Sequence, residues 1–241
     1  MKRFIDLIFS LISLTLISPV LLVVGFLVWL QDKHSPFYIA KRVGKNGKFF
    51  NMVKLRSMVV NADKSGVEST SMNDSRITPL GHFIRNYKLD ELTQLWNVVL
   101  GDMSLVGPRP NVKSETDLYT DVEKLLLSVR PGITDFSSIV FSDEGEILAN
   151  KTDPDLSYNQ LIRPWKSRLG IFYIENQTLR LDLALIFYTA IAIISKKKAL
   201  SWVISQLVYL NASDELIKVS KRQESLYPSP PPGSSEIVSE R

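Results

Sequence analysis

The feature that most constrains this chain is an uncharged, apolar run near its N-terminus. No residue from Leu7 to Leu30 carries a charge. A helix of this length would extend roughly 36 Å, at about 1.5 Å per residue, which is enough to cross the hydrocarbon core of a bilayer. A secretory signal is one alternative, but signal cores usually have about 7 to 15 residues and end at a small-residue cleavage site that is not evident here. The run therefore predicts a membrane-embedded helix.

The residues around and within this run bear on its topology. Lys2 and Arg3 precede it, and several lysines and arginines follow it over residues 33–48. Basic flanks favour the cytoplasmic side, so both ends prefer the same face of the membrane. Ser18-Pro19 lies near the middle, where proline kinks a helix and the serine hydroxyl can cap the freed carbonyl. We expect a re-entrant helix broken at Ser18 and Pro19, with a spanning helix as the alternative.

Composition limits the chemistry that the rest of the chain can perform. The 241 residues include no cysteine, which excludes disulfides, thiolate metal sites and a cysteine nucleophile. Any metal must therefore be held by oxygen ligands. The 29 Lys+Arg outnumber the 25 Asp+Glu only slightly. This excess favours anionic partners such as phosphates or lipid headgroups and is too small to indicate nucleic acid.

The sequence divides into three parts. We expect residues 1–32 to form the re-entrant membrane helix and residues 33–212 to form a domain with interfacial helices, which carries the candidate catalytic residues described below. Residues 213–241 form a C-terminal extension, in which Pro228–Ser235 is rich in proline and serine. Such a composition cannot bury enough surface to fold, so we expect disorder from about residue 227.

The catalytic domain is predicted to contain a small β-hairpin. Two β-type segments, at residues 37–40 and 49–56, flank the turn Gly44–Gly47. Strand alternation puts Lys54 and Arg56 on one face, either as cations for a phosphate or as a solvated strand edge. Because few other strands are evident for a parallel sheet, we predict an α+β fold that is mostly helical and compact.

Two adjacent carboxylates open the clearest helical pattern in the chain. Asp90 and Glu91 begin a predicted helix that ends at Leu100, with Gly101 as the stop. Its apolar stripe comprises Leu92, Leu95, Trp96, Val99 and Leu100. A structural role is one interpretation, since Asp90 suits an N-cap and Glu91 suits the positive end of the helix dipole. Adjacent carboxylates can also bind a divalent ion and supply an oxygen nucleophile.

Several arginines are placed to bind phosphate near these carboxylates. Two prolines bracket Arg109 and fix the backbone around it, and a guanidinium on a rigid loop suits bidentate phosphate binding. A turn that carries a surface arginine is the alternative. Arg130 also lies beside a tight turn, and Arg85 lies about one helical turn before Asp90.

Four segments carry a family resemblance. They are Lys54–Met58 (KLRSM), Leu89–Val98 (LDELTQLWNV), Gly101–Pro110 (GDMSLVGPRP) and Arg130–Thr134 (RPGIT). Together they closely resemble the bacterial sugar transferases, the monotopic phosphoglycosyl transferases, over about Lys2 to Ser195. Members of that family move a sugar phosphate from a nucleotide diphosphate sugar, usually a UDP-sugar, onto undecaprenyl phosphate. They also use a re-entrant helix broken at a Ser-Pro pair, which Ser18-Pro19 resembles.

The resemblance implies roles for the candidate residues. Asp90 is similar to the nucleophile that forms a covalent phosphosugar intermediate, and Glu91 to its partner near Mg²⁺, so both are candidate metal ligands. Mg²⁺ suits an all-oxygen, water-rich site with few protein ligands. The candidate phosphate-binding residues are Arg85, Arg109, Lys54 and Arg130.

We therefore expect a transferase of the bacterial inner membrane, with its catalytic domain on the cytoplasmic face. It would transfer a sugar 1-phosphate from a UDP-sugar to undecaprenyl phosphate, release UMP and initiate an O-antigen, capsule, exopolysaccharide or glycoprotein glycan. The expected partners are the UDP-sugar, undecaprenyl phosphate, Mg²⁺ and inner-membrane lipids. Downstream glycosyltransferases and a second copy of the chain are further candidates, and nucleic acid is not.

Two other functions stay open. A catalytically silent membrane scaffold would recruit other transferases through the helix Leu200–Leu210 and the proline-rich tail. A phosphatase acting on lipid diphosphates would use the same groups but pass the phosphoryl group to water. The sequence departs from the family pattern after Thr134, where a Gly-Trp-x-Gln continuation is more common, so we expect specificity to differ within Asp135–Leu148.

Overall fold

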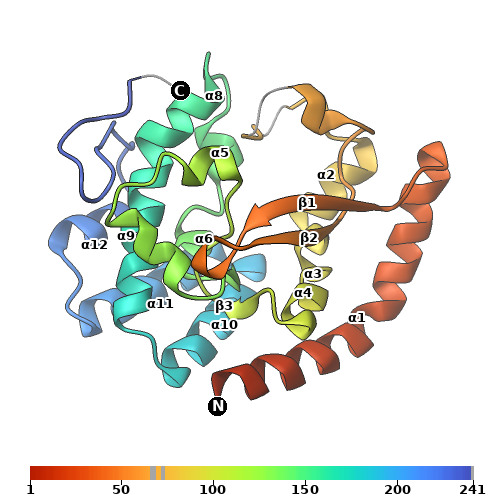
Figure 1. Ribbon diagram of the computed structural model, residues 1–241, viewed down its shortest axis with the longest axis horizontal. Coiled ribbons are helices and arrows are strands. Elements are labelled where there is room, and N and C mark those ends of the chain that lie inside the picture. Colours follow the sequence, from red (N-terminus) through yellow and green to blue (C-terminus); the bar gives the residue numbers. More distant parts are fainter. Residues whose placement is uncertain (66–68, 72–73, 240–241) are drawn as a thin grey trace.

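The computed structural model of the chain describes residues 1–65, 69–71 and 74–239. Helix α1 (Lys2–Asp32) runs along one side of a mostly helical body (Figure 1). Further α-helices are α2 (Pro79–Asn86), α3 (Leu89–Leu92), α4 (Leu95–Leu100), α5 (Lys113–Thr116), α6 (Phe136–Val140), α7 (Glu144–Ile147), α8 (Pro154–Ser157), α9 (Arg163–Glu175), α10 (Leu179–Ile194), α11 (Lys196–Tyr209) and α12 (Asp214–Ser220). Shorter helical turns are η1 (Lys45–Gly47), η2 (Ala62–Ser65), η3 (Glu123–Ser128) and the π-helical η4 (Tyr158–Ile162).

The predicted hairpin is present. Strands β1 (Phe37–Val43) and β2 (Phe49–Leu55) pair antiparallel. At the tip, Asn46 and Gly47 have φ angles of 57° and 73°, in the left-handed region that favours asparagine and glycine. The mostly helical α+β fold with a small hairpin is therefore confirmed.

A second pair of strands is parallel, which the sequence analysis did not predict. Strands β3 (Ser104–Val106) and β4 (Gly132–Thr134) are three residues each, too short to leave a periodic signal. Their backbones pack so closely that a Cβ on Gly132 would lie 2.1 Å from the Gly107 nitrogen. Because parallel strands run in the same direction, the segments that follow β3 and β4 leave from the same edge.

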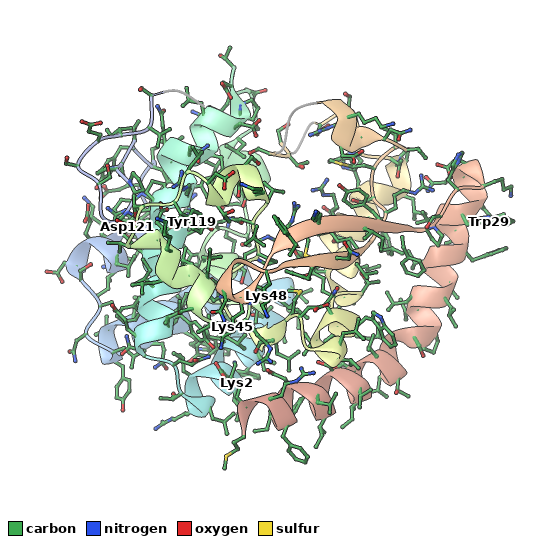
Figure 2. All side chains as sticks on the ribbon, in the orientation of Figure 1. Lys2, Trp29, Lys45, Lys48, Tyr119 and Asp121 are labelled. Carbon is green, nitrogen blue, oxygen red and sulfur yellow. The ribbon has the colours of Figure 1, made fainter. Side chains whose placement is uncertain are left out.

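Charged side chains fix both ends of α1 to the body. At its start, Lys2 Nζ lies 2.6 Å from Asp182 Oδ2 on α10. At its end, Asp32 accepts two hydrogen bonds from Arg56, one of them 2.7 Å from Nη2. Figure 2 shows Lys2 at the lower edge of the body and Trp29 on the outer side near the far end of α1. The two ends of the apolar helix are thus attached to one and the same body.

The middle of α1 keeps its hydrogen bonds despite a proline. Pro19 lacks the N–H that would bond to the Thr15 carbonyl, and Ser18 Oγ donates to that carbonyl at 2.9 Å. The predicted cap is therefore present, and α1 changes direction part-way along its length (Figure 1). Leu16 and Leu22 are each 73% exposed, and α1 is long and apolar enough to cross a membrane. Its membrane topology stays a prediction.

The largest core lies among the C-terminal helices. Its members come mainly from α6, α9, α10 and α11, and Phe136, Trp165, Tyr173, Leu185 and Val203 are at most 1% exposed. This core packs against β3 and β4. One smaller cluster lies between α1, α2 and the hairpin, and another lies between the hairpin and α4.

The helix predicted over Asp90–Leu100 differs in two ways. It forms as α3 and α4, and the apolar stripe is wrong, because Trp96 is 51% and Leu100 is 60% exposed. The buried side of α4 instead carries Asn97, whose side chain bonds the Asn51 carbonyl and the Val53 N–H of β2. Backbone groups of a strand edge must find partners when they are covered, so an amide is preferred here to an apolar side chain. Gly101 ends the helix as predicted, with φ at 95°.

The C-terminal extension follows a defined path over η4 and α9, whereas its composition predicts disorder from about residue 227. Ser229 N donates to Gln160 O at 3.0 Å, and Arg168 Nη2 donates to Pro230 O at 3.0 Å. Proline has few conformations to lose, so a proline-rich segment can dock with modest buried surface. The described part of the tail ends at residue 239, and the three domain boundaries stay predictions.

Candidate functional site

The two carboxylates lie in the first turn of α3, but neither caps it. The N-cap position is Lys88, in the left-handed region with φ at 56°, and among the described residues no side-chain hydrogen bond caps this end of the helix. Asp90 is only 8% exposed and belongs to a four-residue helix that contacts β2. The capping interpretation of Asp90 is therefore wrong, and the burial of its carboxylate needs another explanation.

Burial and charge set these two carboxylates apart. Burial and then the neighbouring Glu91 charge raise the pKa of Asp90, against the opposing effects of Lys54 and Arg85. Burial alone would raise the pKa of Glu91 too, but Arg109 and the nearby lysines outweigh it and lower that pKa to about 2. Adjacent groups with pKa values moved in opposite directions are characteristic of acid–base and nucleophilic sites.

Arg109 provides the direct partner of Glu91. Its Nη1 donates to Glu91 Oε1 at 2.8 Å, and the Glu91 charge in turn raises the pKa of the guanidinium. The loop Gly107–Pro110 that carries Arg109 leaves the end of β3, and Gly107 N donates to Thr134 O at 2.9 Å. The predicted rigid loop is therefore held against β4, with Arg109 facing the start of α3.

Two further cations lie close to Asp90 without bonding to it. Lys54 comes from β2 and Arg85 from the last turn of α2. Within the described residues, neither the Asp90 carboxylate nor the Lys54 amine makes a hydrogen bond or ion pair, and the buried Arg85 Nη1 has no partner. Burial and then the Arg109 charge lower the pKa of Lys54 to about 8. A buried donor without a partner is costly, so an incoming anion would be stabilised here.

The same donor set fits a hard divalent cation with few protein ligands. Asp90 and Glu91 supply two carboxylates, and the described residues contain no cluster of three or more His, Cys, Asp or Glu that could hold a metal. Mg²⁺ usually binds through one or two carboxylates, with water and substrate phosphate completing its shell. The residues present are compatible with such an ion only if the substrate contributes oxygens.

The structure bears on two further cations named from the sequence: Arg130 stays a candidate phosphate-binding residue, whereas the expected role of Arg56 is corrected. The Arg130 guanidinium donates to Gly101 O at 2.8 Å and, within the described chain, makes no hydrogen bond or ion pair with Asp90 or Glu91. Arg56 does not share a phosphate site or a solvated edge with Lys54, because it is buried and paired with Asp32. The strand ends at Leu55, so alternation no longer fixes the direction of the next side chain.

Sequence reasoning missed Glu144 and Lys166, which lie beside Arg109. Glu144 Oε2 accepts a hydrogen bond from Lys166 Nζ, and Lys166 lines a cavity of about 20 Å³ together with Arg109. The parallel pairing of β3 and β4 places the segments carrying Arg109 and Glu144 on one edge. The only usable signal was that Glu144 lies in the region Asp135–Leu148, which departs from the family pattern.

Comparison with known proteins agrees with this arrangement. Residues 1–196 match the family model described as bacterial sugar transferase. The chain is 35% identical, over 78% of its length, to a UDP-galactose-lipid carrier transferase of Erwinia amylovora. It is 33% identical, over 83%, to an undecaprenyl-phosphate galactose phosphotransferase of Salmonella typhimurium. The matches cover 39% and 41% of those two proteins.

A shorter relative matches over most of its own length. It is the exopolysaccharide production protein ExoY of Sinorhizobium fredii, which is 32% identical over 80% of this chain and 84% of the relative. The family match begins before α1 and ends at the start of α11, so it contains the whole candidate site. The chain belongs to the bacterial sugar transferase family.

Proposed function

We propose that this chain is a phosphoglycosyl transferase. It transfers a sugar 1-phosphate from a UDP-sugar to undecaprenyl phosphate, releases UMP and so begins a lipid-linked glycan. The names of the relatives from Erwinia amylovora and Salmonella typhimurium support the class of donor and acceptor. The O-antigen, capsule, exopolysaccharide and glycoprotein pathways all remain candidates for the product.

One observation carries the proposal. A buried carboxylate without a partner in the described chain, that of Asp90, lies among cations that are also unpaired, Lys54 and Arg85. A scaffold would gain nothing from unsatisfied buried charges, since each lowers stability. A phosphate of the donor would satisfy the two cations and bring its phosphorus to the carboxylate.

The proposed reaction has two displacements. An oxygen of Asp90 attacks the phosphorus that bears the sugar, a phosphorus–oxygen bond forms, and UMP leaves with the bridging oxygen. An oxygen of undecaprenyl phosphate then attacks the same phosphorus and releases the Asp90 carboxylate. Arg109, oriented by Glu91, stabilises charge on the transferred phosphoryl group. Bound Mg²⁺ would neutralise the diphosphate, with Asp90 and Glu91 as its protein ligands.

We further propose that α1 is re-entrant and places the site at the cytoplasmic face of the inner membrane. Lys2 and Asp32 tie its two ends to one body, and a spanning helix would have to separate them. Because the chain has no cysteine, one variant can carry a single cysteine inserted directly after Met1 and another a single cysteine in place of His34. Each is treated with an impermeant thiol reagent in sealed vesicles. Both should react from the cytoplasmic side. Labelling from opposite sides would establish a spanning helix.

The reaction is tested by measuring UMP release from a panel of UDP-sugars with undecaprenyl phosphate and Mg²⁺. The lipid product and the mass of the protein are followed in parallel. Release matched by lipid-linked sugar, with a sugar phosphate on Asp90 when the acceptor is omitted, is the expected result. Release of inorganic phosphate from a lipid diphosphate, without lipid-linked sugar, would identify the phosphatase instead. No turnover and no nucleotide binding would identify the scaffold.

A further inference from the structure

Glu144 is an acidic side chain near the candidate site to which neither the motifs nor the proposed reaction gives a role. It begins α7, which follows α6 and β4. The loop carrying Arg109 follows β3, and β3 and β4 are parallel, so the two segments leave the same edge of this strand pair. The fold therefore brings a residue of the divergent region Asp135–Leu148 towards the phosphate-binding loop.

The neighbours of Glu144 place it more closely. Lys166 of α9 donates to its Oε2, and Lys166 and Arg109 line the same cavity of about 20 Å³. Burial alone would raise the pKa of Glu144, but the charges of Lys166, Arg109 and Lys88 outweigh it and lower that pKa. Lys88 precedes α3 and Arg109 pairs with Glu91, so Glu144 is an anion close to the candidate site.

One oxygen of this carboxylate remains available. Within the described residues Oε1 accepts no hydrogen bond, and the side chain is 32% exposed. The Arg109 side chain is also partly accessible to solvent, at 36% exposure. Asp143, directly before Glu144, is held by Lys196 at 3.0 Å and by Arg222 at 3.1 Å, which fixes the start of α7. A free acceptor on a braced helix is pre-organised for a ligand.

The charge of Glu144 restricts what it can bind. A fixed anion repels phosphate, but a carboxylate is a strong acceptor for hydroxyl groups. We propose that Glu144 accepts a hydrogen bond from a ring hydroxyl of the donor and is a specificity-determining residue. This inference rests on the proposed function. Both rings that flank the diphosphate, the sugar and the ribose, carry such hydroxyls, and an acidic sugar would be rejected by charge.

The experiment compares donors that lack single hydroxyls. The best UDP-sugar of the panel is tested beside its deoxy-sugar analogues and its 2′- and 3′-deoxyuridine analogues. The kcat/KM for nucleotide release is measured for wild-type, Glu144→Gln and Glu144→Ala enzymes. We expect Glu144→Ala to lower kcat/KM for the intact donor about tenfold or more, because a hydrogen bond to a charged group is lost. For the analogue that lacks the bound hydroxyl, kcat/KM should be the same for wild type and variant. That analogue also shows whether the hydroxyl belongs to the sugar or to the ribose.

The matched control is Glu146→Gln, on the exposed side of the same short helix. It should behave as wild type with every donor. An equal loss in Glu144→Ala with all analogues, or no loss with any, would overturn the inference and leave the proposed function standing. If wild-type enzyme turns over no donor, the proposed function fails. In that case the affinities of wild type and Glu144→Ala for the intact and the deoxy UDP-sugars are measured by calorimetric titration. The inference is rejected if the two proteins bind the intact and the deoxy donors alike.

Discussion

Two glutamate–arginine pairs lie near the loop that follows β3, and they differ in burial and in their other partners. The Glu123–Arg163 pair is buried, with side chains 0% and 2% exposed, and is bidentate at 3.1 and 2.6 Å. The Glu91–Arg109 pair makes one hydrogen bond, and its side chains are 15% and 36% exposed. Arg109 and Arg163 line the same small cavity, so the two pairs are close neighbours.

The pairs differ in what else they bond. Beyond its partner, Arg163 donates to Asn159 Oδ1 and Leu118 O, while Glu123 also accepts from Ser167 Oγ. The Glu91–Arg109 pair is instead surrounded by charges that lack partners in the described chain, including that of Asp90. A saturated pair can only hold the fold together. An unsaturated one can bind a ligand, because it still has donors and acceptors to offer.

The largest expected effect tests the unsaturated side at Asp90. Asp90→Asn should lower the rate of UMP release by at least about a thousandfold, because the amide is not a nucleophile. Its thermal stability should be unchanged or higher, since the carboxylate makes no hydrogen bond or ion pair within the described residues and burial outweighs the nearby cations. The exposed Asp121→Asn serves as the control for both measurements. An active Asp90→Asn enzyme would remove the proposed nucleophile.

The saturated side is tested by Glu123→Gln. This change leaves the Arg163 charge buried and unpaired, which should lower the free energy of unfolding by about 3–5 kcal/mol. Urea denaturation in detergent micelles measures the loss. If stability is unchanged while donor binding is lost, Glu123 belongs to the functional site and the comparison fails.

Glu91→Gln should affect function more than stability. The pair is partly exposed, so its contribution to stability is small, about 0–1 kcal/mol. Loss of the Glu91 charge should lower kcat about a hundredfold, because Arg109 loses its orientation. It should also raise the Mg²⁺ concentration needed for half-maximal rate, because Glu91 is a candidate ligand of the ion. Titration of Mg²⁺ against UMP release gives both values. An unchanged Mg²⁺ requirement would remove Glu91 as a candidate ligand.

The smallest expected effect concerns Lys54 and pH. Burial lowers the pKa of Lys54 to about 8, so the free enzyme loses this positive charge as the pH rises through 8. Donor binding, reported by kcat/KM, should therefore decrease severalfold above that pH. Lys54→Arg keeps its charge and should flatten the profile. The same decrease in both enzymes would assign the titration to another group.

The local features of this chain were predictable because they depend on residues close in sequence. The apolar run, the Ser18 cap beside Pro19, the hairpin at residues 37–55 and the stop at Gly101 each follow from short-range backbone rules. The motifs also indicated Asp90, Glu91 and Arg109 as candidate site residues, and the structure places Lys54 and Arg85 beside them. The membrane topology, the metal and the residue roles stay predictions.

Other features were decided by contacts between distant segments. The three-residue strands β3 and β4 pair although Ser104 and its partner Gly132 are 28 positions apart, which no periodic pattern records. Asn97 is buried, and Trp96 exposed, only because β2 requires hydrogen-bond partners at that position. The motifs alone show which residue types are available for phosphate chemistry. Tertiary structure decided which of them remain unpaired, because satisfying a buried polar group depends on partners far away in the chain.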